Sequence, residues 1–202
     1  MSPQASAISE KRRRELIQAA YRQIANRGLE GLRTRDVAAE VGVNIATLHY
    51  YFPTKESLIR GVLDHAMARF RSTLAPHGSP SDQLRNHLRA VRKLMSEEPE
   101  LGMVMAELAL RSARDRSIEK ISNETRDAWH ATMRGLLRRA ARAGNLRAEL
   151  DSDAVATLII AVLTGLTIPP LSRNSRGDQA LRQLERWLGI DAGSRRSKES
   201  SN

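Results

Sequence analysis

The stretch from residue 154 to residue 172, AVATLIIAVLTGLTIPPLS, contains no charged side chain, and this constrains the fold more than any other part of the sequence. A helix from Ser152 to the break expected at Pro169 has about 16 residues and is roughly 24 Å long, short of the ~30 Å hydrocarbon core of a membrane. A helix that is apolar all round and too short to span a bilayer must be buried between other helices. We therefore expect a helical bundle and no membrane partner.

The remainder of the chain shows helical periodicity, and no stretch alternates apolar and polar residues for long enough to predict a strand. Gly28 stands where a first long helix ends and favours a left-handed cap, and Gly42 stands where a second, short helix ends. We expect an all-α fold with about nine helices. The expected helices cover 10–27, 34–41, 45–52, 55–75, 82–97, 100–114, 117–143, 152–168 and 177–190.

The formal net charge of +10 points to a polyanionic partner, because clustered Lys and Arg displace the counterions condensed on a phosphate backbone. Charge alone does not separate this interpretation from a solvated, Arg-rich surface. The chain has no cysteine, which excludes disulfides, thiolate metal sites and a cysteine nucleophile and fits a reducing compartment. Since the first residues also lack the apolar segment of a secretory signal, we expect a cytoplasmic protein.

Catalytic and metal-binding patterns are absent from the sequence. There is no G-x-S-x-G, no H-E-x-x-H, no glycine-rich phosphate loop and no spacing typical of metal ligands. Asp127 and His130 are three residues apart on one expected helix, but no nucleophile is identifiable beside them, so a surface pair is the simpler interpretation. We expect neither an enzyme nor a protein with a metal or cofactor.

Residues 34 to 52 carry the pattern of a helix, a tight turn and a second helix. Gly42 lies in the turn, and Asn44 is a natural cap for the second helix. Tyr51 and Phe52 are expected to turn toward the first long helix. The alternative is that the HYYF segment merely packs a small bundle.

The outer face of the second helix suits the edges of DNA bases. With its side chains the helix is about 10 to 12 Å wide, which matches a major groove about 12 Å wide. Apart from the capping residue it exposes no Arg, Asn or Gln, so we expect apolar contacts and DNA shape to matter more than bidentate reading of guanine. The residues expected to contact DNA here are Asn44, Ile45, Ala46, Thr47, His49 and Tyr50.

Two further sites on this part of the chain are expected to hold the phosphate backbone. Lys55 falls in the first turn of the next helix, where the helix dipole disfavours a cation but favours a phosphate beside it. Thr34 and Arg35 stand at the start of the first motif helix and could hold a second phosphate.

With these residues in place, the stretch GLRTRDVAAEVGVNIATLHYYFPTKESL resembles the DNA-binding domain of TetR-type transcriptional regulators, over about residues 10 to 60. The resemblance rests on a set of residues at the family's spacing. The resemblance implies an Ω-shaped all-α homodimer, with three N-terminal helices on double-stranded DNA and six C-terminal helices around a pocket for a small-molecule effector. The set comprises Gly28, Thr34, Ala38, Gly42, Val43, Phe52 and Lys55.

The resemblance also implies a division of the chain. We expect a flexible arm over 1–9, a helix-turn-helix domain over 10–54, a ligand-binding and dimerisation domain over 55–190, and a disordered basic tail over 191–202. The helix at 55–75 would act as the lever between effector and DNA. Two chains would pair through the helices at 152–168 and 177–190, with interface residues Leu158, Val162, Leu166, Leu184, Trp187 and Leu188.

The ligand pocket is the weakest of these expectations, because an apolar residue on an inner helix stripe is as often ordinary core. Methionine adapts to varied apolar ligands, and His87 and His130 could add polar contacts. The candidate pocket residues are Met95, Met103, Met105, Trp129, Met133 and Leu137.

This chain departs from the family at two positions of the reading helix. His49 stands where Tyr is most frequent, and Asn44 stands where Ser or Thr is most frequent. Asn caps as well as Ser, so only the operator sequence is affected. We expect a ligand-responsive regulator, a repressor released from a near-palindromic operator by a small molecule. The alternative is a small-molecule-binding or structural helical protein without specific DNA recognition.

Overall fold

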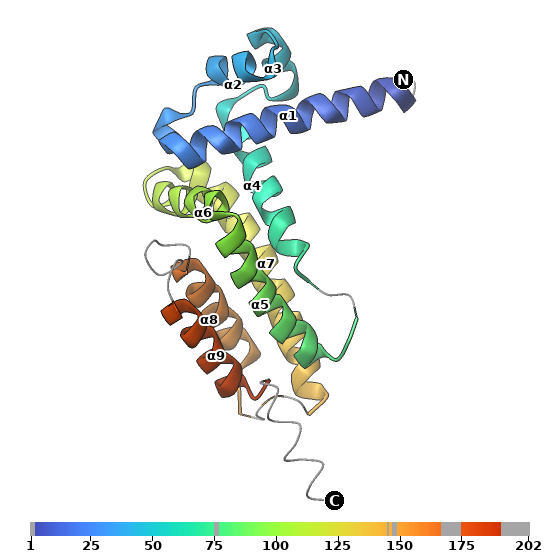
Figure 1. The fold of residues 1–202 in the computed structure, drawn as a ribbon, viewed down its shortest axis with the longest axis vertical. Helices are drawn as coiled ribbons and strands as arrows, with labels where there is room; N and C mark the ends of the chain where they lie inside the picture. Colours follow the sequence, from blue (N-terminus) through green and yellow to red (C-terminus); the bar gives the residue numbers. More distant parts are fainter. Residues whose placement is uncertain (1–2, 75–76, 145, 147–148, 167–174, 191–202) are drawn as a thin grey trace, which may run out of the picture. The chain divides into compact units, whose positions relative to one another are not determined.

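The computed structural model describes residues 3–74, 77–144, 146, 149–166 and 175–190, and this part of the chain is all helical, which confirms the expected fold class (Figure 1). It forms two compact units, residues 1–68 with 100–123 and residues 69–99 with 124–202. The elements are α1 (Pro3–Arg27), the 3-10 turn η1 (Leu29–Gly31), α2 (Thr34–Val41), α3 (Ile45–Tyr51), α4 (Lys55–Arg71), α5 (Pro80–Glu97), α6 (Pro99–Ser112), α7 (Arg116–Arg142), α8 (Ser152–Gly165) and α9 (Ser175–Leu188).

The start of α1 differs more from the expectation than the ends of the other helices. α1 begins at Pro3, so it includes residues expected to form a flexible arm; proline is well suited to a first helical turn. α8 is capped by Asp151, whose carboxylate accepts hydrogen bonds from the backbone N–H groups of Asp153 and Ala154. The break expected at Pro169 and the tail over 191–202 lie outside the described residues.

In the first unit α2 packs on α1, and α3 packs on α2. Leu16 and Ala20 of α1 are buried, as are Leu48 of α3 and Phe52 directly after it. The guanidinium of Arg13 lies 5.3 Å from the centroid of the Phe52 ring, a cation–π distance. Phe52 thus turns toward α1 as expected, and this contact holds the end of α3 in place.

α6 belongs to the first unit, although the sequence placed it in the C-terminal domain. The Glu107 carboxylate accepts a 2.9 Å hydrogen bond from the backbone N–H of Leu29, and Arg111 pairs with Glu30. Gly28 follows α1 with φ of 68° and ψ of 175°, a positive φ that favours glycine but not the left-handed helical cap expected at this position. A side chain at Gly28 would come within 3.1 Å of the Glu107 carboxylate, so α6 closes tightly on this corner.

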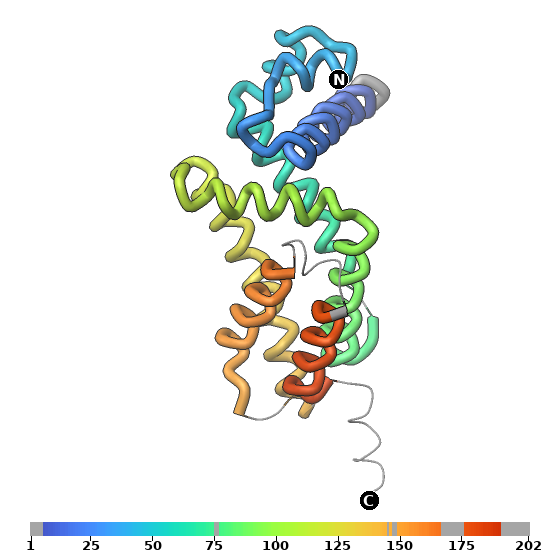
Figure 2. Tube along the Cα trace, turned by 60° about the vertical axis from the view of Figure 1, so that its left-hand side comes forward, coloured from blue at the N-terminus to red at the C-terminus, as the bar shows by residue number. Residues whose placement is uncertain are grey.

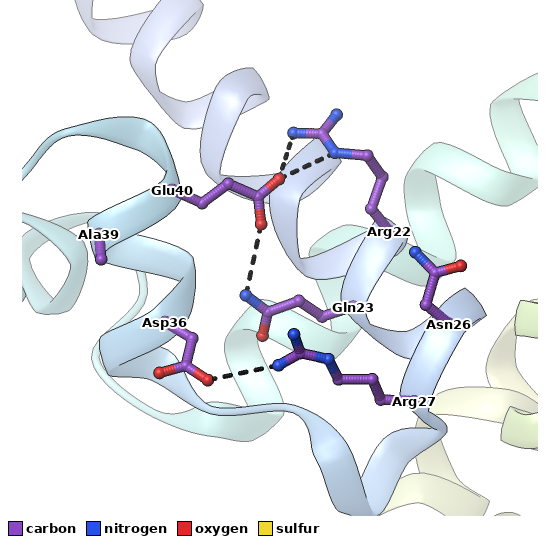
Figure 3. A pocket seen from close by; sticks show the side chains of 7 residues that line it. All are labelled: Arg22, Gln23, Asn26, Arg27, Asp36, Ala39 and Glu40. Atoms are coloured by element: carbon purple, nitrogen blue, oxygen red, sulfur yellow. Dashed lines mark hydrogen bonds and ion pairs between the residues drawn. The ribbon is translucent and has the colours of Figure 1, made fainter.

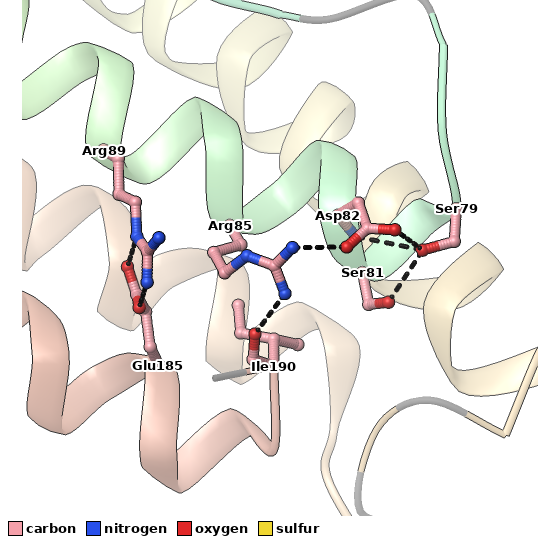
Figure 4. A network of polar contacts seen from close by, with 7 residues as sticks. All are labelled: Ser79, Ser81, Asp82, Arg85, Arg89, Glu185 and Ile190. Carbon is pink, nitrogen blue, oxygen red and sulfur yellow. Dashed lines mark hydrogen bonds and ion pairs between the residues drawn. The ribbon is translucent and has the colours of Figure 1, made fainter. Parts of the chain in front are cut away.

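The second unit holds α9 against α5 through arginine side chains (Figure 4). Arg89 binds both carboxylate oxygens of the buried Glu185, at 2.8 and 2.6 Å, and this hydrogen bonding raises the pKa of Arg89. Arg85 donates to the carbonyl oxygen of Ile190 at 3.0 Å. α8 and α9 lie next to one another in both views of the chain (Figures 1 and 2).

Candidate nucleic-acid interface

α3 is a short helix whose first turn is closed by Asn44. The side-chain oxygen of Asn44 accepts from the backbone N–H of Thr47 at 2.7 Å and from the Thr47 hydroxyl at 2.9 Å. The hydroxyl proton of Thr47 is therefore used inside the helix, which leaves only its oxygen lone pairs outward. In this arrangement Thr47 faces outward as an acceptor, which suits an adenine or cytosine amino group better than a phosphate oxygen.

The remaining outer residues of α3 face solvent, as the sequence predicted. Tyr50 is 78% exposed and Ile45 is 37% exposed, while Leu48 on the opposite face is fully buried. The Tyr50 ring stands edge-on to the half-buried ring of Tyr51, with centroids 5.1 Å apart. This contact restricts the direction in which the Tyr50 hydroxyl projects. Ala46 and His49 are exposed on the same helix.

The turn between α2 and α3 depends on backbone conformation. Gly42 has φ 70° and ψ 35°, in the left-handed region, and no atom lies within 4 Å of the position that its β-carbon would take. The backbone N–H of Val43 donates to the carbonyl of Ala38 at 2.9 Å. The glycine is therefore required by the turn itself, and not by a lack of space.

Ion pairs fix the direction of α2 on α1 (Figure 3). Glu40 accepts from Arg22 at 2.7 Å and from the side-chain amide of Gln23 at 3.4 Å, and Arg27 lies 3.7 Å from Asp36. These residues line an open groove of about 390 Å³ between the two helices. Because its charged side chains pair with one another, we interpret the groove as a contact that holds α2 on α1 and not as a ligand site.

The residues expected to bind phosphate lie at two helix starts. Lys55 is half-buried at the first position of α4, where Thr54 and Ser57 cap each other: the N–H of Ser57 donates to the Thr54 hydroxyl at 3.1 Å and the N–H of Thr54 to the Ser57 hydroxyl at 3.2 Å. Thr34 is the first residue of α2, and Arg35 is exposed beside it. The residue before α2, Arg33, makes no capping hydrogen bond with its side chain.

The expected dimer residues fall into two groups. Leu158 and Trp187 are 44% and 58% exposed, and Val162 is half-buried. Leu166, Leu184 and Leu188 are instead buried within their own subunit, where they pack its core. The apolar stripe of α9 predicted from the sequence is thus largely the face that packs inside its own subunit. Ala154 and Ala161 on α8, which the sequence interpretation did not assign to the interface, are also exposed, as is Ala180 on α9.

The expected pocket residues do not form one group. Met103 is 46% exposed on α6, and Met105 is half-buried on the same helix; both belong to the first unit. Trp129 is half-buried in the second unit, and the other three, Met95, Met133 and Leu137, are buried there.

The pair of His130 and Asp127 considered from the sequence does not form. His130 does not pair with the exposed Asp127: its Nε2 lies 3.1 Å from the Thr157 hydroxyl and 3.2 Å from the Asp153 carbonyl oxygen, which ties α7 to α8. Within the described residues no group of three or more His, Cys, Asp and Glu could hold a metal ion. In that same part of the chain, every helix is too short or too polar to cross a bilayer.

Comparisons with known proteins agree with this geometry. Residues 16–62 match the family model of bacterial regulatory proteins of the tetR family, and residues 74–167 match that of the tetracyclin repressor-like C-terminal domain. The HTH-type transcriptional repressor KstR2 of Mycobacterium tuberculosis is 28% identical over 155 residues, 73% of this chain and 76% of that protein. The regulator PksA of Bacillus subtilis is 26% identical over 172 residues, covering 79% and 78%.

Solved structures show the same fold. A TetR transcription regulator from Haloarcula marismortui superposes with a TM-score of 0.77 at 18% identity, covering 89% of this chain and 97% of that one. A protein from Saccharomonospora viridis, solved in complex with choline, gives a TM-score of 0.69 at 26% identity, covering 89% and 96%.

Proposed function

The chain belongs to the tetR family of bacterial regulatory proteins, and on this premise we propose that it is a cytoplasmic, homodimeric repressor that leaves its operator when a small molecule binds. The observation that carries the proposal is the outer face of α3, because Ile45, His49 and Tyr50 are exposed on a capped helix and nothing in the described part of the chain covers them. Such a helix fits a major groove and presents its side chains to base edges.

The chemistry of α3 defines the kind of sequence that it reads. Ile45 and Ala46 offer apolar contacts to thymine methyl groups, and the Thr47 oxygen accepts from an adenine or cytosine amino group. None of these side chains donates the paired hydrogen bonds that guanine requires. We expect a preference for A·T pairs under the helix, with Lys55 and Arg35 fixing its register on the phosphates.

Pairing of two chains is supported by the exposed apolar side chains of α8 and α9. Leu158 and Trp187 would be costly to leave in water, and the small Ala154 and Ala161 permit close approach of a second helix. The ion pairs from α5 hold α9 in place for this contact. A two-fold dimer reads two half-sites, so we expect a near-palindromic operator.

Coupling between effector and DNA is supported by the course of α4. The helix starts at Lys55, in the first unit, and its last residues, from Arg69, belong to the second. An effector that changes the second unit therefore acts on a helix whose first turn is expected to hold a phosphate. A differential affinity of about 1 to 3 kcal/mol would change operator binding roughly 5- to 150-fold.

Selection of genomic DNA fragments by the purified protein tests the proposal. We expect enrichment of a near-palindromic, A·T-rich element, bound with an affinity that falls steeply as salt rises. Absence of any enriched element, with binding that depends on charge alone, would favour the alternative of a helical protein without specific DNA recognition.

A further inference from the structure

Two polar atoms buried in the second unit have no hydrogen-bond partner among the described residues: Nε2 of His87 on α5 and Nε1 of Trp129 on α7. Buried polar groups in proteins are almost always hydrogen-bonded, since an unpaired one costs about 1 to 3 kcal/mol. The side chain of His87 is fully buried, so bulk water does not reach it. Each atom is therefore available for a hydrogen bond with a partner from outside the described residues.

The hydrogen bonds of Thr73 fix which nitrogen of His87 carries the proton. The Thr73 hydroxyl lies 2.6 Å from the carbonyl oxygen of Phe70, and because a carbonyl only accepts, the hydroxyl must donate there. Nδ1 of His87 lies 2.7 Å from the same hydroxyl oxygen and must therefore donate to it. Nε2 is left as the unprotonated nitrogen, whose lone pair needs a donor.

The imidazole of His87 keeps this form at neutral pH. Burial lowers its pKa to about 4, and hydrogen bonding with the backbone of Thr73 only partly opposes this effect. Nε2 is thus an acceptor throughout the physiological range.

Phe70 links the two orphaned atoms. Its carbonyl holds the Thr73 hydroxyl, which holds His87, and its ring stacks on the Trp129 ring with centroids 5.5 Å apart. The indole N–H can only donate. Both residues with an unpaired atom are therefore linked to Phe70, His87 through the Thr73 hydroxyl and Trp129 through ring stacking. Further along α7, the side chains of Met133 and Leu137 are buried and apolar.

The interior of this unit offers no free charge. Among the described residues of the second unit, the buried polar or charged side chains are Ser81, His87 and Glu185. Ser81 lies 3.0 Å from the Ser79 hydroxyl, and Glu185 is bound at both oxygens by Arg89. An ionic ligand would lose its hydration without a counter-charge, which is strongly unfavourable.

We propose that the interior beside Phe70 binds a neutral, mainly apolar molecule whose hydroxyl group donates a hydrogen bond to Nε2 of His87. The Trp129 N–H supplies a donor to an oxygen of the same molecule. This inference rests on the proposed function, which gives the second unit an effector. A single buried water on Nε2 is the competing explanation.

The test uses full-length protein with ¹⁵N-labelled His and Trp, and probes in matched pairs: phenol with toluene, and cyclohexanol with methylcyclohexane. We expect a hydroxyl probe to shift the Nε2 signal of His87 and the Nε1–H signal of Trp129, and to bind about tenfold more tightly than its hydrocarbon partner. His87→Leu should abolish this preference. His77→Leu, at an exposed histidine, should keep it.

Trp129→Phe keeps a smaller aromatic ring against Phe70 and removes the N–H, so it provides a second variant if His87→Leu fails to fold. Failure of every probe to bind, equal affinity within each pair, or a preference that both interior variants retain would leave only a buried water and overturn the inference. Operator selection separates this result from the proposed function. A protein that selects an operator but shows no preference for hydroxyl probes refutes this inference alone. A protein that prefers hydroxyl probes but selects no operator refutes only the proposed function.

Discussion

The carboxylate of Glu107 accepts a 2.9 Å hydrogen bond from the backbone N–H of Leu29, which precedes it by 78 positions in the chain. That N–H opens the turn between α1 and α2 and is one of the helix-end donors that need a partner. Glu107 on α6 therefore stabilises the turn that follows α1.

Glu107→Ala should lower the free energy of unfolding by about 1 to 2 kcal/mol, because it leaves a partly buried N–H unpaired. Denaturant unfolding measures this, and hydrogen exchange should show reduced protection of the Leu29 amide. Glu100→Ala, at an exposed position of the same helix, is the control. Unchanged protection of Leu29 would mean that the corner holds without Glu107.

Gly42→Ala should destabilise the protein by about 1 kcal/mol through backbone conformation alone, since open space surrounds the glycine and its φ is 70°. Gly42→Asn should cost less, because Asn tolerates the left-handed region. Gly61→Ala gives a contrasting case: its β-carbon would meet Phe52 at 3.1 Å and Ile17 at 3.2 Å. Thermal unfolding of the three variants should rank Gly42→Asn as the mildest change.

DNA binding should respond differently to phosphate and base contacts. Lys55→Ala should weaken binding to operator and random DNA alike and reduce the slope of log affinity against log salt by about one. Tyr50→Ala, at a side chain that is 78% exposed, should lower operator affinity more than random affinity. Titrations at several salt concentrations distinguish the two, and equal losses on both DNAs for Tyr50→Ala would argue against base reading by α3.

Dimerisation should depend on the exposed residues of α8 and α9 and not on the buried ones. Trp187→Glu should give a folded monomer, since this side chain is 58% exposed in the single chain. Leu184→Ala should instead lower stability by about 2 to 5 kcal/mol, because it opens a cavity in the subunit core. Sedimentation measures the first effect and denaturant unfolding the second. A dimeric Trp187→Glu protein would exclude this surface as the interface.

The protein should lose stability in acid through His87. Its pKa is about 4 when folded and 6.5 when unfolded, so between these values the unfolded chain binds more protons. Stability from this group is complete above pH 6.5 and falls by up to about 3 kcal/mol as pH drops to about 4. The slope of unfolding free energy against pH in this range should decrease in His87→Leu and stay unchanged in His77→Leu.

The sequence predicted the helix-turn-helix well because its signals are local. Gly42, the Asn44 cap and the buried Phe52 each act within a few residues, and each has the expected conformation or burial. The link from Glu107 to Leu29 was not foreseeable, since nothing local to either residue indicates the other.

The apolar stripe of α9 shows a different limit. Periodicity identifies the side of a helix that avoids water, but it does not say whether the same chain or a second copy covers that side. Leu184 and Leu188 are covered by their own chain, whereas Trp187, on the flank of the stripe, is left exposed. Likewise, Met103 lies on an expected inner stripe yet faces solvent on α6.

The bond from the Thr47 hydroxyl to Asn44 makes one residue control how its neighbour behaves toward DNA. With Asn at position 44, Thr47 meets a base only as an acceptor. A residue there without a side-chain acceptor would leave the threonine proton free to point outward. Operator preference could thus drift between related regulators through a change at the cap, while every side chain that touches a base stays the same.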